Sequence, residues 1–282
     1  ILFTGNIEAI TGISTKSVLL LSFAGAIHFN IGRYANFRAT KAMGANLVGP
    51  IISSSLILTL TLAIIFLDEV LTPLKTLGIM MIIFGPIIAL RSPSASGSVE
   101  RRSKNNSFTP NLTEGYAYAL LSAVIFGITP ILIREAFLDS GGTNVSNGLI
   151  GGLVAYISAT AALALYLAVP KNFRHAVSTD RVAAGWFIVT GIFVCVSHML
   201  RFMALAVAPV SVVSPIIQSS GIFRTIFGWF INKQHEIFDA WVLTGIAMTI
   251  LGAIALTLST ETILSILNLP TSVVSFLSWT WP

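Results

Sequence analysis

Charged residues are scarce in this 282-residue sequence, where Asp, Glu, Lys and Arg together make up 10%. An ordinary soluble domain holds about 25%, and a chain that is 55% hydrophobic could not hide its apolar surface behind so few charges. An ordinary soluble domain is therefore excluded. A nucleic-acid binder is excluded as well. The net charge of +5 comes from basic residues that mostly lie between apolar runs, and these residues form no basic face that could bind a phosphate backbone.

Cysteine is almost absent. The single Cys195 excludes a disulfide framework and a cysteine-based zinc site. The phosphate-binding pattern G-x(4)-G-K-[ST] does not occur, which argues against a nucleotide-driven pump. The four histidines are dispersed over different segments, and all acidic residues lie in loops or at expected helix ends. No cofactor and no metal site are predicted, and a membrane-embedded enzyme acting on lipids or prenyl groups is kept only as an alternative.

Long uncharged runs are plentiful. A membrane-spanning helix needs about 20 apolar residues, and runs of this length without strict alternation indicate helices rather than barrel strands. The sequence predicts an all-α, polytopic transmembrane helical bundle. Its eight visible helices are expected near 17–36, 47–67, 72–91, 115–136, 148–169, 183–206, 211–231 and 238–258.

Residues 92–113 break this pattern with a Ser-, Asn- and Pro-rich stretch that is typical of a flexible linker. The linker separates a three-helix part, residues 1–91, from a five-helix part, residues 114–258. Residues 259–282 are uncharged apart from Glu261, are divided by Pro270 and end in two tryptophans. We interpret them as an interfacial C-terminal tail, with a ninth span as the alternative.

The two parts contain an internal repeat. PIISSS at residues 50–55 corresponds to PIIQSS at residues 215–220, an offset of 165 that also pairs Arg33 with His198 and Asn36 with Arg201. With two extra residues, the repeat pairs Glu69 with Glu236, and two glycines of one helix, Gly78 and Gly85, with Gly245 and Gly252. A match of this length in this order indicates duplication.

The second copy has five expected helices and the first only three, so we predict that the first copy is truncated and that the intact unit has five plus five helices. Because five is odd, the second copy would enter the membrane from the opposite side. Inverted repeats of this kind are a secondary-transporter architecture, with the substrate site at the repeat interface near the bilayer midplane.

These motifs resemble the EamA-like family of the drug/metabolite transporter superfamily over about residues 17–258. The resemblance rests on the two PII[SQ]SS segments, the helix-end Glu69 and Glu236, the G-x(6)-G helices, and GYAYALLSAVIFGITPILIREAF as the opening helix of a repeat. It implies ten helices in intact members, alternating access and no ATPase domain.

Polar residues inside apolar runs usually face a bundle interior or a cavity, so they are the candidates for binding substrate. They are Arg224, Gln218, Arg201, His198, Asn36, Arg33, Ser54 and Thr129. Each has a structural alternative: arginines near helix ends reach headgroups, serines bond their own backbone, and His198, like His28, fills a packing position. Glu69, Glu236 and Arg134 are expected to act mainly at helix ends.

Arg224 indicates the charge of the substrate, because a guanidinium deep in an apolar run needs a partner and no predicted span offers a carboxylate at that depth. We predict an integral membrane secondary transporter or facilitator of a small anionic or zwitterionic metabolite, an amino acid or organic acid. The cell membrane is the expected location, with the bilayer and the solute as partners. A non-transporting scaffold, a homodimer and the membrane sidedness are left open, since the basic loop residues and the family resemblance favour opposite orientations.

Overall fold

The computed structural model describes residues 13–43, 48, 51–90, 111–141, 144–178, 180–220, 240–257 and 279–280. The regular elements within these ranges are all helices, which confirms the predicted all-α class. Three of the described helices are long and apolar enough to cross a membrane: α8 (Leu112–Asp139), α9 (Val145–Leu167) and α11 (Arg181–Val207). Their mean hydropathies of 2.0, 1.9 and 1.8 agree with a helical membrane protein.

The chain forms two compact units, and each unit combines segments from both parts of the sequence. The first comprises residues 1–67 and 111–210, and the second comprises residues 68–110 and 211–282. The units therefore divide the chain by packing, whereas the predicted domain boundaries follow the repeat along the sequence. Those boundaries stay predictions, because most of the 92–113 linker and of the 259–282 tail lies outside the described residues.

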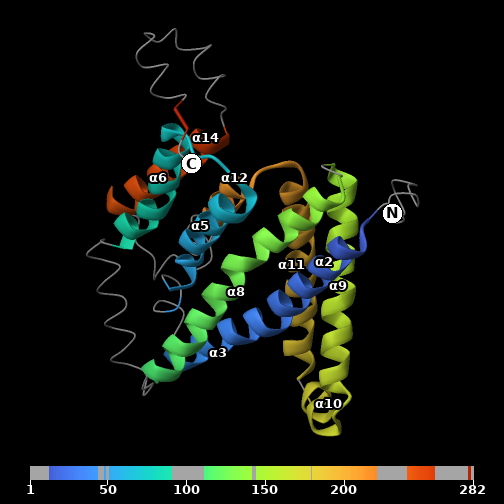
Figure 1. The fold of residues 1–282 in the computed structure, drawn as a ribbon. Helices are drawn as coiled ribbons and strands as arrows, with labels where there is room; N and C mark the ends of the chain where they lie inside the picture. The colour runs from blue at the N-terminus through green and yellow to red at the C-terminus, as the bar shows by residue number, and fades with distance from the viewer. Residues whose placement is uncertain are drawn as a thin grey trace. The chain divides into compact units, whose positions relative to one another are not determined.

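The first unit is built around α8 and α9 (Figure 1). Helix α2 (Thr15–Ala26) packs on α9, while α3 (Arg33–Met43) and α5 (Ser55–Leu67) pack on α8, and α11 packs on α9. Side-chain caps fix where the long helices begin: Asn111, Asn144 and Asp180 each accept a hydrogen bond from a backbone N–H in the first turn of α8, α9 and α11. These caps satisfy donors that the helix itself leaves unpaired.

Small residues allow the helices of the first unit to approach closely. A Cβ on Gly25 of α2 would overlap the backbone of Ala155 in α9, and one on Gly148 of α9 would lie 2.5 Å from the Cα of Met203 in α11. Polar groups bridge other contacts: Thr59 Oγ1 donates to the carbonyl of Gly127 at 3.0 Å, and both residues are buried. The small residues at these contacts thus allow the helix backbones to come close together, as is usual where helices associate in a membrane.

The second unit contains α6 (Pro73–Leu90), α14 (Ala240–Thr257) and most of α12 (Val210–Gln218). Helices α6 and α14 pack on each other through the glycines that the repeat pairs. A Cβ on Gly85 would lie 2.7 Å from the carbonyl oxygen of Gly245, and one on Gly252 would lie 2.7 Å from that of Gly78. Because the repeat pairs Gly85 with Gly252 and Gly78 with Gly245, the two contacts are equivalent.

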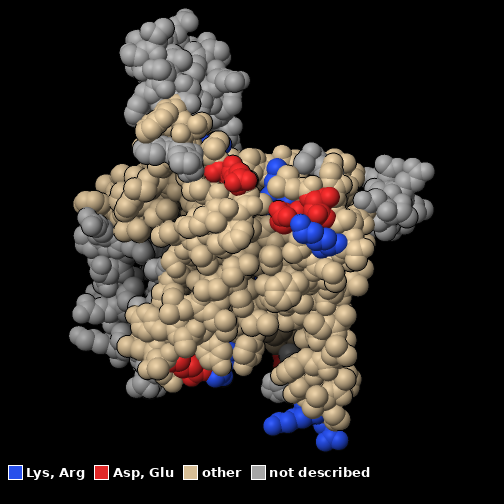
Figure 2. All heavy atoms as spheres, in the orientation of Figure 1, with Lys and Arg blue, Asp and Glu red and all other residues tan. Residues whose placement is uncertain are grey.

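Helix ends hold the charged groups that sequence analysis assigned to them. A carboxylate oxygen of Glu69 accepts a hydrogen bond of 2.8 Å from the backbone N–H of Ser211 at the start of α12, where the helix dipole favours negative charge. Arg134 Nη1 donates to the carbonyls of Leu205 and Ala206 in the last turn of α11. Glu236 lies outside the described residues. Figure 2 shows one face of the molecule, on which the described charges gather in small groups and leave wide uncharged surface between them.

Two local features differ from the predicted spans. The first span, expected at 17–36, is helical from Thr15 to Met43. The middle of this stretch is a π-helical segment, η1 (Ile27–Gly32), which separates α2 from α3. A further short helix, α10 (Pro170–Val177), occupies a connection that we expected to be loop. Its proline stands at the first turn, where no backbone N–H is needed. Of the span expected at 211–231, the structure describes only the part up to residue 220.

Candidate functional site

Four basic or titratable side chains of the first unit meet inside the membrane-spanning region. His28 comes from the π-helix η1, Arg33 from the start of α3, and His198 and Arg201 from α11. We call these four residues the polar cluster. Nη2 of Arg33 lies 2.8 Å from Nε2 of His198, and the rings of His28 and His198 stand edge to face with their centroids 5.2 Å apart. Because a guanidinium can only donate, Nε2 of His198 is the acceptor and carries no proton in this contact.

Aromatic rings hold the two histidines in place. The ring of Phe29 stacks on Tyr156 of α9 at 4.5 Å and meets His198 edge on at 4.9 Å, measured between centroids. The ring of Phe126 on α8 lies 4.8 Å from His28. Helices α8, α9 and α11 therefore all contribute to fixing the cluster, which leaves His28 buried and His198 half-buried.

The π-helical turn explains how His28 and Arg33 reach the same region. Its wider turn, a form that often occurs at functional sites, changes the register between α2 and α3. Two hydrogen bonds anchor it: Nδ2 of Asn30 donates to the carbonyl of Ala159 at 3.2 Å, and Ser122 Oγ donates to that of Gly32 at 3.1 Å. The sequence does not predict this turn, because hydrophobic periodicity does not distinguish one π-helical turn from an α-helical one.

The polar cluster carries positive charge without a balancing acid nearby. Within the described part of the chain, ion pairs are confined to Lys16, Glu135 and Asp139 and to Arg38 with Glu114, all outside the cluster. Buried polar atoms of the cluster, Nε of Arg33, Nε of Arg201 and Nδ1 of His28, have no hydrogen-bond partner among the described residues. A buried donor of this kind costs about 1–3 kcal/mol when it is left unpaired, and more when it is charged.

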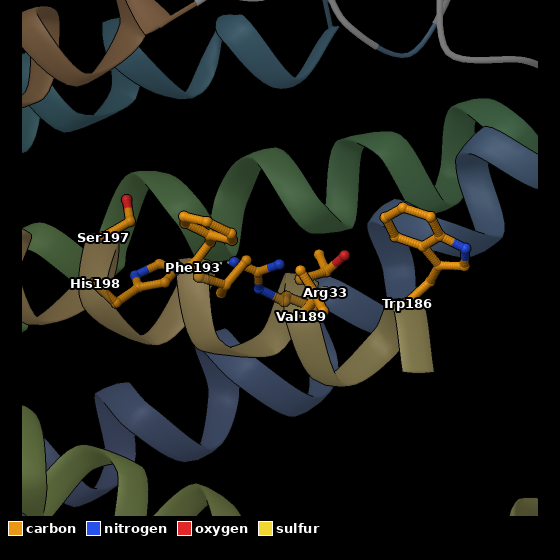
Figure 3. A pocket seen from close by; sticks show the side chains of 8 residues that line it. Arg33, Trp186, Val189, Phe193, Ser197 and His198 are labelled. Carbon is orange, nitrogen blue, oxygen red and sulfur yellow. Dashed lines mark hydrogen bonds between the residues drawn. The ribbon is translucent and has the colours of Figure 1, made fainter. Parts of the chain in front are cut away.

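A cavity of about 420 Å³ opens beside the cluster. Arg33 and His198 line it together with six further residues of α11: Trp186, Val189, Thr190, Phe193, Val194 and Ser197. In Figure 3 the Arg33 side chain reaches this row from α3 and lies between Phe193 and Val189, with His198 at one end and Trp186 at the other. The volume falls within the range of about 300–1,000 Å³ that is usual for small-molecule sites.

The candidate residues from the sequence separate into three groups. Arg33 and His198 are in contact, and Arg201 lies close enough to both for their charges to interact. Asn36 accepts a hydrogen bond from Thr40, Ser54 bonds the carbonyl of Ile51 in the turn before α5, and Thr129 bonds that of Ile125 in its own helix. Gln218 lies half-buried at the end of α12 in the second unit, and Arg224 lies outside the described residues.

Several residues that shape the site were not predicted. Phe29, Tyr156, Phe193 and Trp186 are aromatic residues in apolar runs, where such residues are usually packing or lipid-facing positions. Helical spacing could have suggested Phe29, which lies one turn from Arg33, and Phe193 and Trp186, which share α11 with His198, but nothing in the sequence points to Tyr156 on α9. No group of three or more His, Cys, Asp or Glu side chains suited to a metal ion occurs within the described ranges.

Comparison with known proteins identifies the family. The family model "Magnesium transporter NIPA" matches residues 5–217, which is most of the chain. A solved structure titled only "Crystal structure of protein" is similar over 88% of this chain and 85% of its own, with 15% identity and a TM-score of 0.60, and this likeness concerns the fold alone. No curated protein matches the chain.

The family match confirms the coarser part of the predicted identity, a membrane transporter, while membership of the EamA-like family itself stays a prediction. The apolar helices and the family together make the chain an integral membrane protein. By the match over residues 5–217, the chain belongs to the NIPA magnesium transporter family.

Proposed function

We propose that this protein moves a small solute across the cell membrane by alternating access, and that Mg²⁺ is the first candidate solute. The observation that carries the proposal is the family match over residues 5–217. The absence of a P-loop pattern from the sequence agrees with a carrier that uses no nucleotide. Three long apolar helices and several shorter ones supply the membrane-embedded body that such a carrier needs.

The polar cluster does not offer the ligands that Mg²⁺ prefers. This ion binds carboxylate and carbonyl oxygens and keeps several of its waters, whereas the cluster presents two guanidinium groups and two imidazoles. Positive side chains also repel a divalent cation. We therefore place the binding of Mg²⁺ in other parts of the chain, and assign a different role to the cluster.

An anionic or zwitterionic solute, such as an amino acid or organic acid, is the second candidate. The observation that favours it is the polar cluster itself: Arg33 and Arg201 have buried Nε donors without partners among the described residues. A guanidinium binds a carboxylate through two parallel hydrogen bonds. Arg224, which suggested this substrate charge from the sequence, takes no part in this argument, and Arg33 replaces it.

Alternating access is supported by two reciprocal contacts between the copies of the repeat. In the second unit, Gly85 meets Gly245 as Gly252 meets Gly78. In the first, Arg33 contacts His198, which is its own counterpart at an offset of 165. Contacts of this kind are expected where two copies are related by a pseudo-two-fold axis. We propose on this basis that the two parts form an inverted repeat.

Proteoliposome uptake tests the proposal. The full chain is reconstituted into vesicles that contain a fluorescent Mg²⁺ indicator, and parallel vesicles receive radiolabelled amino acids or organic acids. Mg²⁺ entry above that of empty vesicles supports the first candidate, and uptake of a labelled anion supports the second. Neither entering would overturn the proposed function.

The Arg33→Gln variant separates the two candidates, with Arg174→Gln on the exposed surface of α10 as the matched control. Loss of anion uptake in the Arg33 variant alone would place the anion at the polar cluster. Faster Mg²⁺ entry in that variant would instead show that the guanidinium lies on the Mg²⁺ route and repels the cation. This result would contradict our proposal that Mg²⁺ binds away from the polar cluster.

A further inference from the structure

The apolar side of the cavity is not explained by transport of a small hydrophilic ion. Beyond Arg33, the lining consists mainly of aromatic and aliphatic side chains of α11. Trp186 is 70% exposed and Phe193 is 73% exposed, and both border this open cavity. A hydrated Mg²⁺ ion gains nothing from such walls.

The lining residues form one continuous face of α11. Positions 186, 189, 190, 193, 194, 197 and 198 recur at intervals of three and four, which is the spacing of a single helix face. From Trp186 to His198 this face spans about 18 Å at 1.5 Å per residue. The cavity is therefore elongated along the helix, with an apolar end at Trp186 and a polar end at His198.

A guanidinium group interrupts this apolar row. The Arg33 side chain enters from α3 and lies between Phe193 and Val189 (Figure 3). Its Nη2 contacts His198 and its Nε is buried, so a ligand in the cavity would meet the remaining N–H groups of the guanidinium. The cavity thus combines one fixed positive charge and an extended hydrophobic wall.

From this combination we propose that the cavity binds an organic monocarboxylate with an apolar body, its carboxylate on Arg33 and its aromatic or aliphatic part along Phe193 and Trp186. Charge complementarity selects the anion, and burial against the wall of α11 selects the apolar body. The inference rests on the second candidate of the proposed function and deepens it, because it names the class of organic acid and the wall that selects it. Binding is measured without transport, so a failure to bind is distinct from a failure of Mg²⁺ or anion uptake.

The position of the Arg33–His198 contact along α11 argues against a membrane phospholipid as the intended ligand. His198 lies 17 residues from the start of α11 at Arg181 and 9 residues from its end at Val207. A phospholipid headgroup stays at the membrane surface, whereas this contact is well inside the helix. A phosphate headgroup would therefore have to leave the interface to reach Arg33, while a small carboxylate need not.

Direct binding to the purified full chain tests the inference. The probe is radiolabelled 4-phenylbutyrate, and unlabelled competitors are 4-phenylbutanol, which lacks the charge, acetate, which lacks the apolar body, and a vesicle-delivered anionic phospholipid. We expect only unlabelled 4-phenylbutyrate to compete strongly. Equal competition by 4-phenylbutanol, by acetate or by the phospholipid would overturn the proposal, because the site would then select for apolar surface, charge alone or lipid.

Matched variants locate the ligand. Arg33→Gln should weaken binding by roughly tenfold or more, since it removes a charge-assisted hydrogen bond. Phe193→Ala should also weaken it, while Phe187→Ala should not, because Phe187 is on the same helix and 71% exposed but does not line the cavity. Equal effects of the two phenylalanine variants would contradict the assignment.

Discussion

Nη2 of Arg33 lies 2.8 Å from Nε2 of His198, and the two residues are 165 positions apart, which is the offset of the internal repeat. The contact therefore joins equivalent positions of the two copies. It also joins unlike side chains, a permanent cation and a neutral imidazole. If the two parts are copies, as we propose, they meet here with different chemistry, and the two halves of the site are expected to play different roles.

A double-mutant cycle should show that Arg33 and His198 act together. Arg33→Gln, His198→Gln and the double variant are compared through their free energies of unfolding in detergent. We expect a coupling of about 0.5–3 kcal/mol, as for residues in direct contact. Arg33→Gln combined with the distant, exposed Arg174→Gln serves as the control pair and should be additive. Additivity of the contacting pair as well would mean that the hydrogen bond contributes nothing to stability.

Gly25→Ala should destabilise the first unit. The added Cβ would overlap the backbone of Ala155, which cannot move aside as a flexible side chain could. Forcing such a contact costs about 1–3 kcal/mol, to be measured as a lower thermal unfolding temperature. Gly191→Ala on α11 is the control, since nothing lies within 4 Å of its Cβ position. Equal unfolding temperatures for the two variants would contradict the close packing of α2 on α9.

Gly85→Ala and Gly252→Ala should both lower stability. Each new Cβ would lie 2.7 Å from a backbone carbonyl of the facing helix, that of Gly245 or Gly78, and the one on Gly85 would also overlap Oγ1 of the buried Thr249. Because the two contacts are equivalent, we expect losses of about 1–3 kcal/mol in both variants. Gly185→Ala, which meets nothing within 4 Å, is the comparison. A large loss in one variant and none in the other would argue against reciprocal packing of α6 and α14.

Arg134→Met should destabilise the protein more than the same change at an exposed arginine. Nη1 of Arg134 donates to the carbonyls of Leu205 at 3.0 Å and Ala206 at 2.8 Å, in the last turn of α11. Methionine keeps much of the apolar stem but removes the donors, so we expect a loss of about 1–3 kcal/mol. Arg174→Met should change the unfolding free energy by less than about 0.5 kcal/mol. If Arg134→Met left the free energy of unfolding unchanged, the two hydrogen bonds of Arg134 would not stabilise the fold, and contact with lipid headgroups would explain this residue better.

The sequence by itself determined the class of this protein and the course of its helices. Long uncharged runs predict α8, α9 and α11, because the cost of unpaired backbone groups in lipid leaves a helix as the local solution. The repeat offset singled out Arg33 and His198 as equivalent and paired Gly78 and Gly85 with Gly245 and Gly252, which the structure then places in one helix interface. These are local or periodic properties, which a single chain displays directly.

Only the tertiary structure decided which of these residues meet. The π-helical turn at Ile27–Gly32, the aromatic frame of Phe29 and Tyr156, and the cavity beside Arg33 have no signature in composition or spacing. Ser54 and Thr129 looked like substrate ligands in the sequence, but their hydroxyl groups bond backbone carbonyls three and four residues earlier in the chain. The physical reason is that hydrophobic periodicity defines which face of a helix is apolar, whereas contacts across more than a hundred residues depend on how helices cross, and close contacts between small residues set those crossings.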